Sequence, residues 1–427
     1  MATTTGVFIP TRYAIILIVT LLWMSAVQIQ DLTASYPQVV QHKHEGGETS
    51  HHYVESKPVL RNPQDHGVCR FYLAESAVAK NSGMGIFSAV GLHPGDQISF
   101  PDLCIFVAEP PQHWTHLHSH TWGWGTYFGQ YEGLHSRAAC EGIHTTYNTM
   151  PDHMINTRIQ SPVQPTTAGV RRQTTPAAGA ISHHYGIRSE AITTVEAGGE
   201  LTIYYGDWEF DTKAGPLSKP RRTVSDLETN GWCIDHVEIK QSNIEGAGRG
   251  LFTKRRLPAG TTVVPAPLQV FEDRSIFPRP NGQEQLFINY CLQPPNSNMM
   301  VYPYGPGCNL INHSRNPNVG LRWSDKNLHH GEFLLLENAS EFFKKGWPGT
   351  LVLEFYALRD LQAGEEILLD YGDAWQAAWD EHVANWTPPP GAEDYVYPED
   401  MDNAAQLLTV EEQKEKPYPK SIMVGYS

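Results

Sequence analysis

The sequence predicts a mainly β fold with short helices (α+β), arranged as two tandem domains. Its 36 Gly and 31 Pro among 427 residues are typical of many turns between short strands. Apolar or alternating runs such as residues 350–358 (TLVLEFYAL) are cut by Gly, Pro and Asn clusters about every ten residues, which favours strands. At roughly 150 residues per domain the length allows two domains with tails, and an internal repeat indicates two.

The repeat consists of two gapped patterns in the same order. Residues 67–98 resemble residues 231–263, so that Cys69 matches Cys233 and the Gly-x-Gly pair at 83 and 85 matches the pair at 248 and 250. Residues 191–208 resemble residues 357–375, which matches Tyr205 with Tyr371. We therefore expect a first domain at 65–212, a linker at 213–230 and a second domain at 231–387. The basic KPRR stretch of the linker is typical of a solvated connection, with a nuclear signal as the alternative.

The two termini are expected to lie outside these domains. Arg12 precedes the apolar residues 13–27, and fifteen residues fit a signal-peptide core better than a membrane helix of about twenty. Residues 1–36 are therefore expected to be a signal peptide or anchor with a leader, which routes the chain into the secretory pathway. An uncleaved anchor and a buried helix are the alternatives. Residues 37–64 form a low-order, His-rich segment, and residues 388–427 an acidic, Pro-rich tail.

Charge and cysteine usage exclude several functions. The net charge of −15 opposes a broad phosphate-binding surface, so no nucleic-acid partner is expected, whereas a basic protein partner suits it. The six Cys form no CxxC pair, which excludes a zinc ribbon but leaves up to three disulfides open. His116, His118 and His120 alternate at a ligand-like spacing, with His113 nearby. No carboxylate or Cys completes that set, so no metal site is predicted.

Three motifs of the second domain carry chemistry. They are residues 246–252 (GAGRGLF), 309–318 (NLINHSRNPN) and 364–372 (GEEILLDYG). In order and spacing they resemble the signatures of SET-domain protein lysine methyltransferases. The resemblance covers about residues 231–386 and, in degraded form, the first domain. It implies a SET fold with a knot-like threading near the C-terminal end of the second domain, an exception to the rule against threaded chains.

The resemblance also implies S-adenosylmethionine-dependent methyl transfer to a protein lysine. Such an in-line displacement mainly requires that a neutral amine be aligned with the methyl group in a dry channel. Gly248 and Gly250 would let the backbone approach the cofactor closely, with Arg249 between them supplying backbone groups. In this family an Asn-His pair binds the amino-acid end and the adenine edge of the cofactor, and Asn312 and His313 stand at that position.

Tyr371 is the expected catalytic tyrosine, because a phenol can orient an amine and face the methyl group while staying neutral. It would also contact the cofactor. A narrow aromatic channel lowers the pKa of the incoming lysine by desolvation. Tyr302, Tyr304 and Phe355 are expected channel walls, and Tyr290 is a further candidate.

Two departures from the family pattern matter. Many members close the channel with a Cys-rich zinc segment after the catalytic tyrosine, but no Cys follows Cys308. A predicted helix with Trp375, Trp379, His382 and Trp386 on one face would serve as the lid instead. In the first domain, aligning Pro151 with Pro317 places residues 146–148 (TYN) where 312–314 (NHS) stand. That alignment puts Thr146 opposite Asn312, so the first domain is expected to be a structural or substrate-positioning partner whose cofactor pocket has lapsed.

The expected function is methyl transfer from S-adenosylmethionine to a lysine of a basic protein by the second domain. Its alternative is a non-catalytic SET-like binding module, membrane-anchored if the apolar run is uncleaved. Asn312, Asn338 and Asn385 begin glycosylation sequons. A glycan on Asn312 would abolish the proposed pocket, so a secretory route conflicts with the enzyme unless folding buries that residue first. Such a route also argues against histones as the acceptor.

Overall fold

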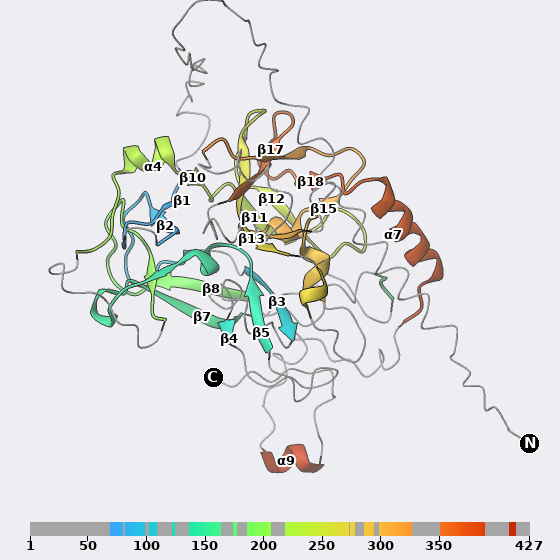
Figure 1. Cartoon of the computed structure of the whole chain (residues 1–427), viewed down its shortest axis with the longest axis horizontal. Coiled ribbons are helices and arrows are strands. Elements are labelled where there is room, and N and C mark those ends of the chain that lie inside the picture. The colour runs from blue at the N-terminus through green and yellow to red at the C-terminus, as the bar shows by residue number, and fades with distance from the viewer. Residues whose placement is uncertain are drawn as a thin grey trace, which may run out of the picture.

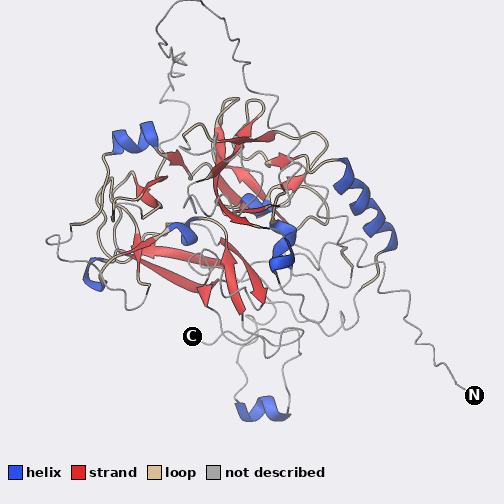
Figure 2. Cartoon of the chain, in the orientation of Figure 1, coloured by secondary structure: helices blue, strands red, loops and turns tan. Residues whose placement is uncertain are grey.

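The fold is given by a computed structural model that describes residues 69–79, 82–98, 102–108, 122–123, 136–163, 174–176, 186–205, 218–272, 274–277, 286–293, 299–326, 351–388 and 410–415. It is mainly β with short helices, as the sequence predicts (Figure 2). The apolar run 13–27, the His-rich segments, Asn338 and most of the acidic tail lie outside these residues. Among the described residues no helix has the length and apolar character needed to cross a membrane.

The first half of the chain is built around a five-stranded sheet in the order β4-β5-β3-β8-β7. The strands of this sheet are β3 (Asp102–Ala108), β4 (Trp122–Gly123), β5 (Ser136–Cys140), β7 (Thr157–Val163) and β8 (Gly186–Ala191). Before them come β1 (Phe71–Glu75) and β2 (Met84–Ser88), which form a hairpin. The short β6 (Asn148–Thr149) pairs in parallel with β9 (Thr202–Ile203). The 3₁₀ turns η1 (Ile143–Thr146) and η2 (Asp152–Met154) flank β6.

The second half has a four-stranded sheet in the order β14-β13-β17-β16. Its strands are β13 (Thr262–Phe271), β14 (Met300–Pro303), β16 (Val319–Trp323) and β17 (Val352–Ala357). A hairpin of β11 (Val237–Gln241) and β12 (Arg249–Thr253) precedes it, and β15 (Asn312–His313) pairs in parallel with β18 (Leu368–Leu369). The 3₁₀ turns are η4 (Arg274–Ile276), η6 (Leu286–Tyr290) and η7 (Cys308–Leu310), and the helices are α7 (Asp373–Asn385) and α9 (Val410–Glu415).

Strand β13 shows why an apolar run becomes a central strand here. Nearly all of its residues are buried, because it lies between β14 and β17 and contributes side chains to three hydrophobic clusters. A strand covered on both faces needs apolar residues at successive positions and not only at alternate ones. Residues 263–271 supply them at every position except Gln269, a buried polar residue.

The two halves are joined by paired strands and by shared cores. After helix α4 (Val224–Asn230), strand β10 (Trp232–Cys233) pairs with β1 of the first half, with Cys233 opposite Tyr72. One cluster combines Leu73 of the first half with Trp232 and Val352 of the second. Another combines Ile105, Val107 and Ala139 of the first half with Phe271 and Tyr302 of the second. Figure 1 shows α4 beside β1 and β10, and α7 at the opposite side of the molecule beside β15 and β18.

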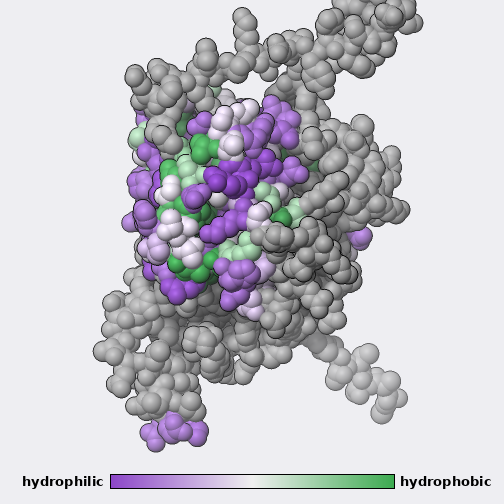
Figure 3. Space-filling model, turned by 90° about the vertical axis from the view of Figure 1, so that its left-hand side faces the viewer, coloured by the Kyte–Doolittle hydropathy of each residue, from purple (hydrophilic) through white to green (hydrophobic). Residues whose placement is uncertain are grey.

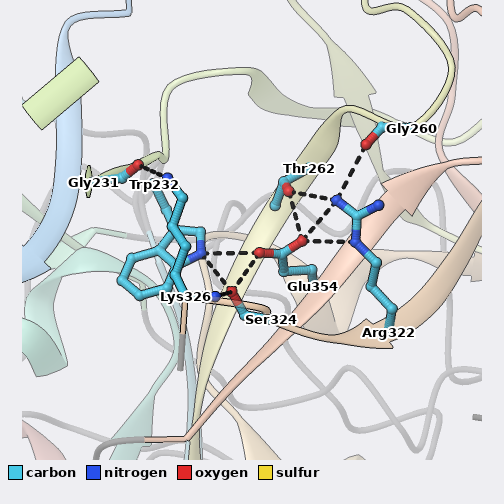
Figure 4. Close-up of polar contacts among 8 residues, drawn as sticks. All are labelled: Gly231, Trp232, Gly260, Thr262, Arg322, Ser324, Lys326 and Glu354. Atoms are coloured by element: carbon cyan, nitrogen blue, oxygen red, sulfur yellow. Dashed lines mark hydrogen bonds and ion pairs between the residues drawn. The ribbon is translucent and has the colours of Figure 1, made fainter. Parts of the chain in front are cut away.

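A buried carboxylate fastens β10 to the large sheet of the second half (Figure 4). Glu354 on β17 accepts hydrogen bonds from Nε1 of Trp232 at 3.0 Å and Oγ of Ser324 at 2.6 Å, and its other oxygen accepts from Thr262 and Arg322. Burial alone would raise the pKa of Glu354, but these hydrogen bonds and the Arg322 charge outweigh it and lower the pKa below its ordinary value.

The cysteines form fewer than the three possible disulfides. Cys69 is bonded to Cys233, so the two cysteines that the sequence repeat matches are joined to each other. Cys140 is also disulfide-bonded, and Cys104 lies opposite it in the β3–β5 register. Cys291 and Cys308 are free thiols.

The linker expected at 213–230 is ordered where the structure describes it. Thr223 caps α4 by accepting a hydrogen bond from the N–H of Asp226. Arg222 donates to the carbonyl of Glu75 at 2.8 Å and lies over the ring of Phe87. Figure 3 shows the α4 side of the molecule, where hydrophilic residues cover much of the described surface around smaller hydrophobic groups.

Candidate active site

The Gly-x-Gly motif lies at the start of β12, and its two glycines meet different requirements. Gly248 has a φ of 75°, a backbone conformation that favours glycine. At Gly250 a Cβ atom would overlap Oε1 of Glu366 and lie 3.2 Å from Nδ2 of Asn312. The space beside Gly250 is therefore filled by the side chains of Glu366 and Asn312. The sequence instead predicts a cofactor contact at this glycine.

Glu366 is the buried carboxylate of this site, with 5% of its surface exposed. It accepts hydrogen bonds from Oγ of Ser242 at 2.6 Å, from the N–H of Asn243 at 2.7 Å and from Nδ2 of Asn312 at 3.2 Å. It thereby ties the β11–β12 turn to β15. The sequence motif GEE contains this residue, but only the fold indicates what it binds.

Asn312 connects all three motifs. Its Nδ2 donates to the carbonyl of Arg249 at 3.0 Å, as well as to Ser242 and Glu366. Within the described part of the chain its Oδ1 accepts no hydrogen bond. An amide oxygen available as an acceptor is therefore present where the sequence places the cofactor.

His313 is held in one tautomer by its neighbours. Its Nδ1 accepts a hydrogen bond from the N–H of Tyr371 at 2.9 Å, so the proton belongs on Nε2, which lies 2.9 Å from Oε1 of Gln376. The imidazole also contacts the rings of Tyr371 and Trp375, with centroid distances of 5.3 and 4.7 Å. These contacts join β15 to the segment that ends in α7.

Helix α7 brings its aromatic face to this site. Trp375 packs edge-on against Tyr371 at 4.9 Å and stacks on Trp379 at 5.8 Å, and Trp379 contacts His382 at 5.5 Å. The predicted helix and the shared face of these three residues are confirmed. Trp386, expected as the fourth residue of this face, is instead the extended C-cap residue after the helix ends at Asn385. Nε2 of His382 lies 3.1 Å from the carbonyl of Pro176, which connects the far end of this face to the first half.

Tyr371 lies next to the Asn-His segment. Its hydroxyl donates a hydrogen bond to the carbonyl of Ile311, the residue before Asn312. Burial raises the pKa of the Tyr371 phenol well above its ordinary value, and the neighbouring Cys308 raises it further. The phenol is therefore neutral at physiological pH, with its oxygen lone pairs available as acceptors.

The expected channel walls are core residues. Tyr302 and Tyr304 are 1% and 2% exposed in the cluster shared by the two halves, and Phe355 is 3% exposed in the core of the second half. Tyr290 is partly buried against the cluster that contains Tyr302 and Tyr304. Burial raises the pKa of its phenol, and the neighbouring Arg249 charge partly opposes that shift.

The side chain of Arg249 is buried beside the Gly-x-Gly motif. It is 9% exposed, and its guanidinium makes no hydrogen bond or ion pair to another described residue. Burial lowers its pKa, which the negative charges available at Tyr290 and Glu141 partly oppose. A buried guanidinium of this kind is costly unless an anion accompanies it.

The first half repeats the same contacts. Glu200 accepts from Oγ of Ser76, from the N–H of Ala77 and from Nδ2 of Asn148, and a Cβ atom at Gly85 would overlap its Oε1. The hydroxyl of Tyr205 donates to the carbonyl of Tyr147, the residue before Asn148.

These contacts match Asn148 with Asn312, so the alignment that put Thr146 in that place was wrong. The next residue, Thr149, then stands where the second half has His313. Tyr205 also differs from Tyr371 in being 45% exposed. The first half therefore keeps the amide and the carboxylate but lacks the imidazole.

Comparison with known families agrees with the motif resemblance. Residues 248–372 match the SET domain. The match begins at the first glycine of the Gly-x-Gly pair and ends just after Tyr371, so the matched region contains Gly250, Asn312, His313 and Glu366. No curated protein matches the chain at a significant level.

Solved structures similar to parts of the chain are distant. A candidate histone methyltransferase of Plasmodium falciparum shares 20% identity over 33% of this chain and 96% of that one, with a TM-score of 0.23. Polycomb repressive complex 2 in an autoinhibited conformation bound to S-adenosylmethionine shares 19% identity over 39% of this chain and 18% of that one, with a TM-score of 0.25. An active polycomb repressive complex 2 in the basal state shares 17% identity over 36% and 17%, with a TM-score of 0.23.

Proposed function

We propose that the SET domain transfers a methyl group from S-adenosylmethionine to the side-chain amine of a protein lysine. The observation that carries this proposal is the meeting of the three motifs. Asn312 donates to the carbonyl of Arg249, and His313 accepts from the N–H of Tyr371. The family match of residues 248–372 supports a methyltransferase-type function.

The groups left open around these motifs fit the zwitterionic end of the cofactor. An ammonium group needs an acceptor such as Oδ1 of Asn312, and a carboxylate needs donors such as the guanidinium of Arg249. These two side chains would hold the amino-acid end, Gly248 would give the backbone close approach, and the backbone of His313 would meet the adenine edge. Gly250 instead makes room for Glu366 and Asn312. When bound, the cofactor supplies the methyl group on a sulfonium.

Tyr371 would orient the acceptor lysine. Because its hydroxyl proton is committed to the carbonyl of Ile311, its oxygen is free to accept an N–H of the neutral amine. The nitrogen lone pair can then face the methyl group, which is the alignment that an in-line displacement requires. The half-buried Trp375 packs against the Tyr371 ring, and its indole would help to exclude water from this position.

The first half fits the role of a degenerate second copy. The repeated contacts of Glu200, Asn148 and Tyr205 support a tandem duplication, and Thr149 in place of His313 supports a lapsed cofactor pocket. In the second half, the parallel pairing of β15 with β18 and the position of α7 beside His313 support a threaded C-terminal segment.

The compartment and the acceptor are also part of the proposal. Disulfides persist in oxidising compartments, so the Cys69–Cys233 bond supports routing into the secretory pathway. In the folded domain the two N–H groups of Asn312 Nδ2 face three acceptors. Folding before glycosylation would therefore keep this nitrogen from receiving a glycan. The net charge of −15 favours a basic protein acceptor over nucleic acid.

Calorimetry with S-adenosylmethionine and incorporation of labelled methyl groups into Lys-rich proteins test this function. The purified protein should bind one cofactor per chain. Asn312→Ala should weaken binding by about 2 kcal/mol, the cost of leaving a charged ligand group unpaired. Asn148→Ala, the matched change in the first half, should leave binding unchanged. Binding without any methyl transfer would favour a non-catalytic binding module, and no binding would refute the proposal.

A further inference from the structure

One carboxylate of the first half lies inside the second half, next to the SET motifs. Glu141 directly follows β5 and is 0% exposed. Its Oε2 accepts a hydrogen bond from the N–H of Asn309 at 2.7 Å and lies 3.7 Å from Sγ of Cys308. The N–H of the next residue, Gly142, donates to the carbonyl of Tyr304 at 2.8 Å.

These contacts act on the segment that leads directly to Asn312. Residues 308–310 form the short turn η7, which starts after Gly307 with a left-handed φ of 70°. A single 3₁₀ turn leaves its first N–H groups without partners inside the turn. Glu141 accepts one of them, that of Asn309, and so fixes where the chain enters β15. Asn312, whose side-chain amide is proposed to bind the cofactor, follows three residues after Asn309.

The second effect of Glu141 is electrostatic. Arg249 is buried without an ion pair to any described residue. Burial lowers the pKa of its guanidinium, and Tyr290 and Glu141 both oppose that shift.

We infer that Glu141 is a positioning residue of the SET site, supplied by the first half to hold the turn η7, and through it Asn312, ready for the cofactor. This inference rests on the proposed function, since it assigns Asn312 to the cofactor. It gives the first half a defined role in the site. Glu141 acts through the turn η7 and touches neither the cofactor nor the lysine.

The test compares Glu141→Gln with Glu354→Gln in the full-length protein. Both substitutions remove the charge of a buried, hydrogen-bonded carboxylate without changing its shape, but Glu354 lies in the network of Trp232 and Arg322. Glu141→Gln should weaken binding of S-adenosylmethionine about tenfold in calorimetry, and Glu354→Gln should leave it unchanged. Glu141→Asp, which keeps the charge, should restore part of the affinity.

A second readout does not depend on the cofactor. Burial raises the pKa of the Cys308 thiol, and the Glu141 charge raises it further. Cys308 lies in η7 and is 5% exposed, so its alkylation requires local opening of this turn. Glu141→Gln weakens the hydrogen bond from the N–H of Asn309 that holds the turn, so Cys308 should be alkylated faster in this variant than in the wild type. Cys291, a free thiol whose raised pKa comes from burial, is the control within the same chain and should react at an unchanged rate.

The outcomes separate this inference from the proposed function. Wild type that binds no cofactor would refute the function, while the Cys308 readout would still decide whether Glu141 controls the η7 turn. Equal loss of affinity in Glu141→Gln and Glu354→Gln, or an unchanged Cys308 rate, would overturn the positioning role. If Glu141→Gln does not fold, Glu141→Asp is tested in its place, because it keeps the charge but moves the carboxylate. An affinity for S-adenosylmethionine equal to that of the wild type in Glu141→Asp would overturn the positioning role.

Discussion

Gly250→Ala provides a test of the carboxylate that holds the SET motifs together. An alanine Cβ would overlap Oε1 of Glu366 and lie 3.1 Å from its Cδ. Since non-bonded atoms prefer separations of about 3.5 to 4 Å, the carboxylate must retreat by roughly 1 Å. Its bonds to Ser242 at 2.6 Å and to Asn243 at 2.7 Å would then exceed hydrogen-bond length.

The expected cost combines overpacking of about 1 to 3 kcal/mol with the loss of charge-assisted hydrogen bonds of about 1.5 to 3 kcal/mol each. Partial relaxation brings the total to roughly 3 kcal/mol of unfolding free energy, measurable by denaturant titration. Because Asn312 also bonds Glu366, cofactor affinity in calorimetry should fall too.

Gly85→Ala is the matched control, because a Cβ atom there would overlap Oε1 of Glu200 and lie 2.8 Å from its Cδ. It should destabilise the protein by a similar amount but leave cofactor binding unchanged in the folded protein. Equal loss of binding in both variants, or normal binding in Gly250→Ala, would refute the assignment of the Glu366 network to the cofactor site.

Other contacts predict three more outcomes. The buried hydroxyl of Tyr302 has no hydrogen-bond partner among the described residues. Tyr302→Phe should therefore leave turnover unchanged and raise the free energy of unfolding by about 1 kcal/mol. A loss of turnover would instead indicate that Tyr302 lines the lysine channel. Replacing Cys69 and Cys233 by Ser should lower the free energy of unfolding by about 3 to 5 kcal/mol, because the bond closes a loop with a sequence separation of 164, and an unchanged denaturation midpoint would contradict this. Mass spectrometry of protein from a secretory host should find glycan on exposed Asn385 and none on Asn312; a glycan on Asn312 would exclude the pocket.

The motif residues could be proposed from sequence because the residues of each motif lie close together along the chain. Asn312 and His313 are adjacent, the Gly-x-Gly pair is contiguous, and Tyr371 ends a recognisable block. The mainly β fold and the aromatic face of α7 likewise follow from local patterns, since turn residues and helical spacing are local properties.

Residues that act through tertiary contacts could not be found in this way. Glu141 lies 168 residues before Asn309, and no local pattern connects the two. The alignment that missed Asn148 used Pro151 and Pro317 as anchors. Asn148 is three residues before its proline and Asn312 five before its own, so a difference in loop length displaced the match by two residues. Side-chain contacts show the equivalence, because both amides bond a buried glutamate.

Methyl transfer by Tyr371→Phe tests the central claim most directly. The substitution keeps the ring against Trp375 and His313 and removes the oxygen proposed to orient the amine, together with its hydrogen bond to the carbonyl of Ile311. Turnover should fall about a hundredfold to a thousandfold, or roughly 2.7 to 4 kcal/mol, with thermal stability and cofactor affinity largely kept. Tyr205→Phe in the first half should have little effect. A silent Tyr371→Phe in an active enzyme, or an equal loss in both variants, would contradict a single catalytic site in the SET domain.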